Sequence, residues 1–164
     1  MPDVSTEVAI ATTTLGSATA SINFTSIPST YTDLRIVLVP VATTTFPQIR
    51  FNSDSGSNYS WTYVSGNGTA AQSGRFTSQT EFYTNIGGDA SIPFMTTFDI
   101  FSYAGSTFKT MLWNETNDKN GSGQTSPKVG LWRSTSAITA VNLRADIYGT
   151  TFGAGTTATL YGIL

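Results

Sequence analysis

Apolar and polar residues alternate along most of this chain with a period of two, the pattern of a β-strand that buries one face. In residues 17–24 every second side chain is apolar, and residues 141–148 repeat this arrangement. Residues 34–41 differ, because they are almost continuously apolar and β-branched. Such a run predicts a central strand that is covered on both faces.

Other apolar segments predict further strands, separated by short polar segments. Residues 94–103 and 108–113 indicate two long strands joined by a turn at Gly105 and Ser106, and residues 157–164 indicate a terminal strand that docks into the sheet. Segments rich in Gly, Asn and Ser predict turns at residues 52–58, 66–68, 87–88, 117–126 and 149–155. The pattern predicts an all-β fold: a single domain over residues 1–164, an antiparallel sandwich of the jelly-roll type.

The chain carries little charge, and hydroxyl groups take its place. Charged residues make up 11% of the sequence, whereas about 25% is usual for globular proteins. The chain contains 29 Thr and 19 Ser, and Thr suits a strand because its branched side chain packs well on a pleated surface. Low charge is typical of buried interface centres, so two interpretations stay open: a protein that packs against neighbours, and a Thr-rich soluble domain.

The charge distribution and the ends of the chain bear on partners and location. The net charge is −2, and the eight Lys and Arg residues are scattered singly, so we expect no nucleic-acid partner. No apolar stretch approaches the 18 residues of a membrane span, and residues 1–7 contain two acids and no apolar run, unlike a secretory signal. We therefore expect no membrane association and synthesis in the cytoplasm.

Histidine and cysteine are both absent. The missing histidine removes the usual general base, the usual zinc ligand and every triad built on His. Glu81, Asp99 and Glu115 are the acids best placed on strands for a glycosidase pair, but a sequence does not reveal their separation in space. Burial within its apolar strand would raise the pKa of Asp99, although the solvent side is the commoner place. We predict no enzymatic activity, no catalytic residue and no cofactor.

One polar segment resembles a calcium loop in composition. Asn52, Asp54, Gly56 and Asn58 alternate with serines, but the EF-hand spacing needs a ligand where Gly56 stands and a glutamate where Tyr63 stands. We predict no metal site and a structural turn that satisfies its own backbone, with Gly56 available for a positive φ if the turn requires one. The flanking strands, residues 48–51 and 59–64, then either pair as a hairpin or cross between two sheets.

Four large aromatic residues could stack on sugar rings or form the core: Trp61, Tyr63, Trp113 and Trp132. Trp113 and Trp132 lie in strand-like runs, which favours the core. Trp61 and Tyr63 lie beside the polar loop and are the better candidates for a surface role. They carry an alternative hypothesis, in which the chain is a glycan-binding module.

Three segments of the chain are similar to one family. Residues 21–34 read SINFTSIPSTYTDL, residues 49–60 read IRFNSDSGSNYS, and residues 157–163 read TATLYGI. In these segments the chain resembles small structural proteins of tailed bacteriophages, in which a strand, a turn with the pattern IP-x-x-Y-x-D-L and a loop with the pattern RFN-x-D-x-G-x-NY recur. The resemblance covers the first 60 residues and the last strand, and the middle matches only in strand pattern.

The resemblance implies a virion protein whose partners are other virion proteins. Structural roles are implied for six residues: Pro28 and Tyr31 in a connection, and Asn52, Asp54, Gly56 and Asn58 in a turn. We expect a capsid decoration (cement) protein on the major capsid protein, because the chain has no collagen-like or heptad repeat of a fibre shaft. The alternative is a head- or tail-fibre module that binds a host receptor or glycan. We expect a homo-oligomer, a trimer before a dimer, since such proteins commonly lie on threefold axes.

Overall fold

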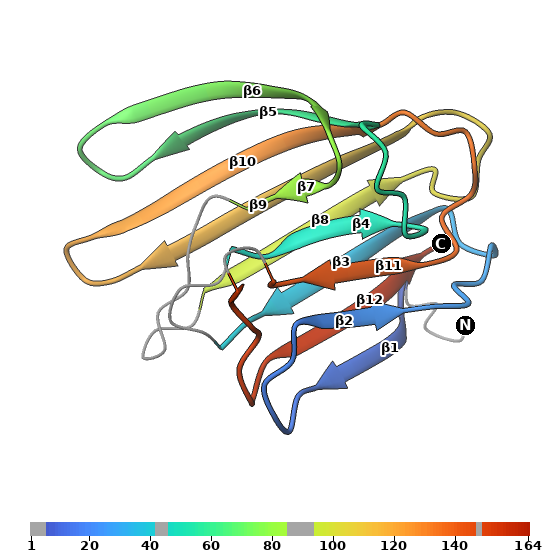
Figure 1. The fold of residues 1–164 in the computed structure, drawn as a ribbon, viewed down its shortest axis with the longest axis horizontal. Coiled ribbons are helices and arrows are strands. Elements are labelled where there is room, and N and C mark those ends of the chain that lie inside the picture. Colours follow the sequence, from blue (N-terminus) through green and yellow to red (C-terminus); the bar gives the residue numbers. More distant parts are fainter. Residues whose placement is uncertain (1–5, 42–45, 85–93, 147–148) are drawn as a thin grey trace.

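Two antiparallel sheets contain all the strands of the computed structural model, which describes residues 6–41, 46–84, 94–146 and 149–164 (Figure 1). The large sheet has eight strands in the spatial order β1 (Glu7–Thr14), β12 (Thr157–Ile163), β3 (Asp33–Val39), β8 (Met95–Phe101), β9 (Lys109–Asp118), β10 (Gly123–Trp132), β5 (Tyr59–Gly66) and β6 (Ala71–Gln79). The small sheet has the order β2 (Ser21–Phe24), β11 (Val141–Arg144), β4 (Gln48–Phe51) and β7 (Phe82–Tyr83). Within the described residues, no helix is long and apolar enough to cross a membrane.

The two sheets pack on each other, which confirms the predicted all-β sandwich. The chain alternates between them as in a jelly roll, from β1 in the large sheet to β2 in the small one, then to β3, β4 and β5 in turn. The loop at residues 52–58 therefore carries the chain from β4 to β5, across the two sheets, which confirms the second of the two expected arrangements. In Figure 1 the small sheet lies in front of the large one, and the β5–β6 and β9–β10 hairpins extend beyond it to the left.

The alternation of apolar residues decides which side chains enter the space between the sheets. In β3, Leu34, Ile36 and Leu38 are fully buried, and Ile36 is paired in register with Phe98 on one side and Leu160 on the other. A cluster of ring-to-ring contacts fills the space farther along the sheet, and it contains Phe51, Tyr59, Trp61, Phe82, Trp113 and Trp132. Burial of this apolar area is the main source of stability, at about 25 cal/mol for each Å² removed from water.

Two sequence-based expectations about strands are wrong. The run at residues 34–41 is not covered on both faces: β3 ends at Val39 and buries only alternate side chains, while the others stay partly exposed. The segment 117–126, predicted to be a turn, is mostly strand, because β9 runs to Asp118 and pairs there with Gly123 of β10. The backbone hydrogen bonds between β9 and β10 continue in unbroken register through these polar residues, so the turn itself is short.

Other predicted elements are found. β8 and β9 pair in antiparallel fashion across a turn in which the Gly105 N–H donates to the Ser102 carbonyl at 2.9 Å. The terminal strand β12 docks between β1 and β3. β11 ends at Arg144, and the last two residues of the predicted strand, Ile147 and Tyr148, lie outside the described residues, as does the turn expected at residues 87–88.

Two of the segments that resemble phage proteins meet in space. The Tyr31 ring lies so close to Gly162 of β12 that a Cβ there would stand 2.3 Å from the ring, so only glycine fits this approach. The Tyr103 hydroxyl donates to the Pro28 carbonyl and accepts the Tyr31 N–H at 3.4 Å. Pro28 and Tyr31 thus lie in a connection that is held to both β12 and the segment after β8.

Candidate interaction surface

The large sheet packs one face on the small sheet, and on its other face no element packs among the residues that the structure describes. We call this side the outer face. On the four neighbouring strands β8, β9, β10 and β5 its side chains are Met95, Thr97, Asp99, Phe101, Thr110, Leu112, Asn114, Thr116, Thr125, Pro127, Val129, Leu131, Ser60, Thr62 and Val64. Asp99 is the ionisable residue of this set, and Asp118, which ends β9 and follows the same alternation, is also ionisable and exposed.

Large apolar side chains lie exposed on the outer face. Their exposed fractions are 51% for Val64, 46% for Met95, 45% for Leu112, 44% for Val129 and 38% for Phe101. Leu112 and Val129 are register partners on adjacent strands, so they lie side by side. Grouped exposed apolar side chains are a feature of interaction surfaces, whereas single ones are ordinary.

Three charged residues of β9 and β10 point the other way, toward the inner side of the large sheet: Lys109, Glu115 and Lys128. Glu115 and Lys128 have no exposed side-chain surface and form an ion pair. The Trp113 indole N–H donates to Oε1 of Glu115 at 2.8 Å, and the Lys128 Nζ lies 5.6 Å from the Trp113 ring centroid. Burial lowers the pKa of Lys128, and Glu115 opposes that shift. Lys109 is also buried, where its Nζ donates to two backbone carbonyls of the preceding turn at 2.6 and 2.5 Å.

Two hollows lie on the outer face, on either side of Leu112. One, of about 310 Å³, is lined by Glu7, Arg35, Val37, Thr97, Asp99 and Tyr161. The other, of about 230 Å³, is lined by residues of β5, β6, β9 and β10 that include Thr62, Arg75, Thr110, Val129 and Leu131. The outer face is therefore uneven, and it can receive projecting side chains.

The charges at these two hollows differ in sign. In the first, Nε of Arg35 lies 2.6 Å from Oδ1 of Asp99, and its Nη1 lies 3.6 Å from Oε1 of Glu7. Among the side chains that line this hollow, two carboxylates and one guanidinium leave one net negative charge. At the second hollow, Arg75 is exposed and makes no ion pair or hydrogen bond with any described residue.

The three acids considered for catalysis lie in separate places. Asp99 is on the outer face of the large sheet, Glu115 is on the inner face, and Glu81 lies beside the small sheet. Glu81 is buried, with Oε2 3.2 Å from Nη2 of Arg50 and 3.1 Å from Nη1 of Arg144. Each carboxylate is thus held by its own cationic partner, and the structure does not bring any two of them together as a pair.

The loop at residues 52–58 uses its polar groups internally. Asp54 accepts hydrogen bonds from the Gly56 N–H at 2.8 Å, the Asn58 amide at 2.9 Å and the Trp132 indole at 2.7 Å. Burial raises the pKa of Asp54, but these three hydrogen bonds and the positive charge of Arg50 together outweigh it, so the pKa is lowered. No group of three or more acidic side chains in the described part of the chain is arranged to hold a metal ion.

Gly56 and Asn52 have roles in this loop that differ from those expected from the sequence. The positive φ values fall on Asn52 and Ser53, at 50° and 57°, and not on Gly56. Gly56 is needed for a close approach instead, because a Cβ there would lie 2.9 Å from the Asn58 amide nitrogen. The Asn52 side chain reaches across to the segment before β11, where its Oδ1 accepts the N–H groups of Thr139 and Ala140 at 2.9 and 3.0 Å.

Trp61 does not have the surface position expected for it. Its side chain is buried, with an exposed fraction of 3%. The Phe76 ring stacks on it at a centroid distance of 4.7 Å, and Phe82 and Trp113 contact it from other sides. Tyr63 is partly exposed beside Phe76, so of the two residues only Trp61 departs from the expected surface position. Trp113 and Trp132 are buried, as expected.

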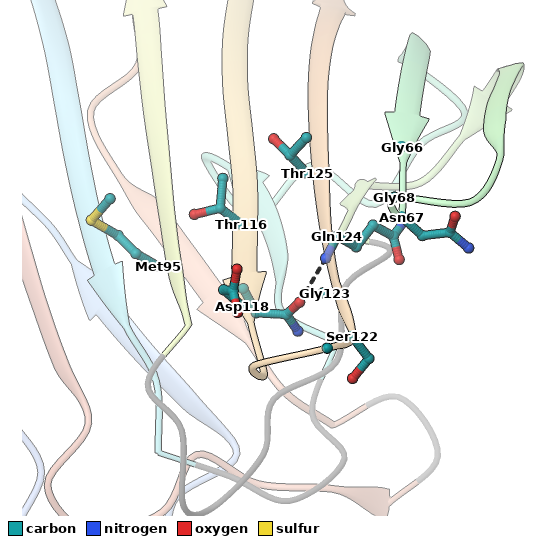
Figure 2. A pocket seen from close by; sticks show the side chains of 12 residues that line it. Gly66, Asn67, Gly68, Met95, Thr116, Asp118, Ser122, Gly123, Gln124 and Thr125 are labelled. Carbon is teal, nitrogen blue, oxygen red and sulfur yellow. Dashed lines mark hydrogen bonds between the residues drawn. The ribbon is translucent and has the colours of Figure 1, made fainter.

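A third hollow, of about 580 Å³, lies between the tips of the β5–β6 and β9–β10 hairpins. Figure 2 shows Asn67 and its neighbours on one side and Gly123, Gln124 and Asp118 on the other, with Met95 farther along the sheet. The Gln124 N–H donates to Oδ1 of Asn117 at 3.0 Å, which closes the base of the β9–β10 turn. Amide and carboxylate groups suit this hollow to a polar ligand, but none of its described lining residues is aromatic.

Sequence reasoning missed the outer face. A signal for it was present in the run Met111-Leu112-Trp113, because three successive apolar residues place one of them on the opposite side of a strand. Arg75 carried no such signal, since its significance depends on having no partner among the residues that the structure describes.

Comparisons with known proteins do not place the chain in a family. No protein-family model, no curated protein and no solved structure matches this chain. The resemblance to phage structural proteins therefore stays a prediction.

Proposed function

We propose that this chain is a non-enzymatic structural protein of a virus particle, a capsid decoration (cement) protein that self-associates on the particle surface. The observation that carries the proposal is the reversed distribution of residues on β9 and β10. The charged side chains of Lys109, Glu115 and Lys128 are buried, which is costly, while Leu112 and Val129 are exposed. A surface that will be covered by a protein partner needs few charges and several apolar side chains.

The ion pairs that hold the buried acids support a role without catalysis. A general acid or nucleophile must reach a substrate, whereas Glu115 is enclosed in the core and Glu81 is bound by two arginines. The internally bonded loop at residues 52–58 supports a rigid scaffold in the same way.

Imaging of the intact particle tests this proposal. We expect density for this chain on the outside of the capsid, in contact with the major capsid protein and arranged around threefold axes. Purified particles that lack the chain, or that carry it only in a tail or fibre, would contradict the decoration role.

A second candidate is a head- or tail-fibre module that binds a host receptor or glycan, and the hollow between the hairpin tips favours it. This hypothesis depends on the polar groups of Asn67, Asp118 and Gln124 and not on the buried Trp61. Glycan-array binding that Gln124→Ala and Asp118→Ala abolish, with an unchanged circular dichroism spectrum, would favour this function. Trp61→Ala is the comparison variant. Because Trp61 is buried in the core, this substitution should lower the stability of the fold and should not remove a contact to the glycan.

A further inference from the structure

We infer that the outer face is the surface by which copies of this chain bind one another, with Arg75 of one copy entering the acidic hollow of the next. This inference rests on the proposed function, a self-associating structural protein. The acidic hollow is the one that Glu7 and Asp99 line around Arg35.

One row of register partners crosses the outer face from one flank to the other. The acidic hollow lies at one end of the row, Arg75 lies at the other, and Leu112 and Val129 lie between them. The residues of the row, in order, are Tyr161, Arg35, Asp99, Leu112, Val129, Thr62 and Arg75.

The two ends of this row are complementary in charge. The acidic end carries one net negative charge, and its two carboxylates keep 31% and 36% of their side-chain surface exposed. Arg75 has no partner among the described residues. A second copy of the chain carries both halves of this match, so self-association pairs Arg75 with Glu7 and Asp99 each time an interface forms.

The size of the outer face fits a stable interface. Eight strands about 4.8 Å apart and seven residues of about 3.4 Å each cover about 900 Å². A standard protein–protein interface buries about 800 Å² on each partner, so the face needs to be covered across most of its width. Contact over that width brings both flanks into the interface along with the apolar centre.

The shape of the outer face also fits a second copy of the chain. Leu112 projects with 45% of its surface exposed, and the hollow of about 230 Å³ beside Val129 is of the right kind to receive an apolar side chain. Projections and hollows on one surface allow two copies to interlock.

Charge reversal tests the pairing. We expect Arg75→Glu to raise the dissociation constant of the oligomer tenfold or more, measured by sedimentation velocity over a concentration series. Adding Glu7→Lys in the same chain should restore most of the affinity. Lys119→Glu, at the tip of the β9–β10 hairpin, is the matched control and should have no effect. Equal weakening by the control, or no rescue by Glu7→Lys, would overturn the pairing.

A second pair of variants tests the apolar centre. Leu112→Glu should give a monomer with an unchanged circular dichroism spectrum, while Leu164→Glu, at an exposed leucine beyond β12, should leave the oligomer intact. If both variants stay oligomeric, the outer face is not the interface, and imaging of the particle still decides the proposed function separately. A wild-type chain that is monomeric at millimolar concentration also overturns this inference.

Discussion

The inner and outer sides of the β9–β10 strand pair alternate residue by residue along the same backbone, and each side holds residues of a kind usually found on the other. The inner side places Glu115 and Lys128 in the core, while the outer side places Leu112 and Val129 in contact with water. The inner charges are acceptable because each has the other, and Trp113, as a partner. The outer apolar residues have no such compensation among the residues that the structure describes.

The comparison shows that burial within one chain and burial within an assembly need not coincide. A buried ion pair adds little net stability compared with apolar side chains of similar size, but removal of one member is costly. An exposed leucine costs little in the free chain, and its value depends on whether a partner covers it. The two sides should therefore respond differently to the same kind of substitution.

The largest effect is expected inside. Lys128→Met leaves the Glu115 carboxylate buried without its cation, which should lower the free energy of unfolding by about 3–5 kcal/mol. The double variant Lys128→Met with Glu115→Leu should recover most of that loss, because both charges are then gone. Urea unfolding followed by tryptophan fluorescence measures both. A single variant that loses less than about 1 kcal/mol would mean that water reaches the pair.

Adjacent residues give the most direct test of the two sides. Met111 is fully buried, so Met111→Ala should cost about 2–5 kcal/mol, through lost burial and a cavity. Leu112→Ala should change the unfolding free energy of the monomer by no more than about 0.5 kcal/mol. At high protein concentration, Leu112→Ala should instead reduce the concentration dependence of the melting temperature. If both variants lost the same unfolding free energy in the dilute monomer, the inner and outer sides of β9 would not differ in the way described.

The loop at residues 52–58 gives a smaller, local effect. The sequence suggests one local hydrogen bond for Asp54, worth about 1 kcal/mol, but the structure has three donors on this carboxylate, so Asp54→Ala should cost about 1–3 kcal/mol. Differential scanning calorimetry with and without EDTA checks this value. The melting temperature should not respond to the chelator, and a fall of many degrees would identify a cation site.

The smallest effect expected is a change in acid sensitivity. Burial raises the pKa of Asp54, but hydrogen bonds from Asn58, Trp132 and Gly56, together with the positive charge of Arg50, hold this pKa below its ordinary value. Stability from this carboxylate is therefore present above its unfolded-state pKa and is lost as the pH falls through its lower pKa in the folded protein. Asp54→Asn should make the decline of melting temperature between about pH 5 and pH 2 shallower. An unchanged slope would mean that the Asp54 carboxylate does not contribute to the pH dependence of stability.

Local features of the chain are predictable because they depend on neighbours in the sequence. The period of two identified most strands, and the run of Asn, Asp, Gly and Ser at residues 52–58 identified the loop between β4 and β5. Where prediction failed, a long-range contact decided the outcome. Trp61 stands beside a polar loop in the sequence, yet pairing of β5 with β6 places Phe76 over its ring.

The sequence by itself determined that this chain forms an all-β sandwich, because alternation of apolar and polar residues is a local property of each strand. Only the tertiary structure decided which alternate face of a strand meets the small sheet and which cation lies beside each acid. Strand order joins residues far apart in the chain, such as Arg35 with Asp99 and Glu7 with Arg35. Neither spacing nor composition encodes that order. The outer face, with Leu112 at its centre and Arg75 at its edge, exists only once eight strands have paired in register.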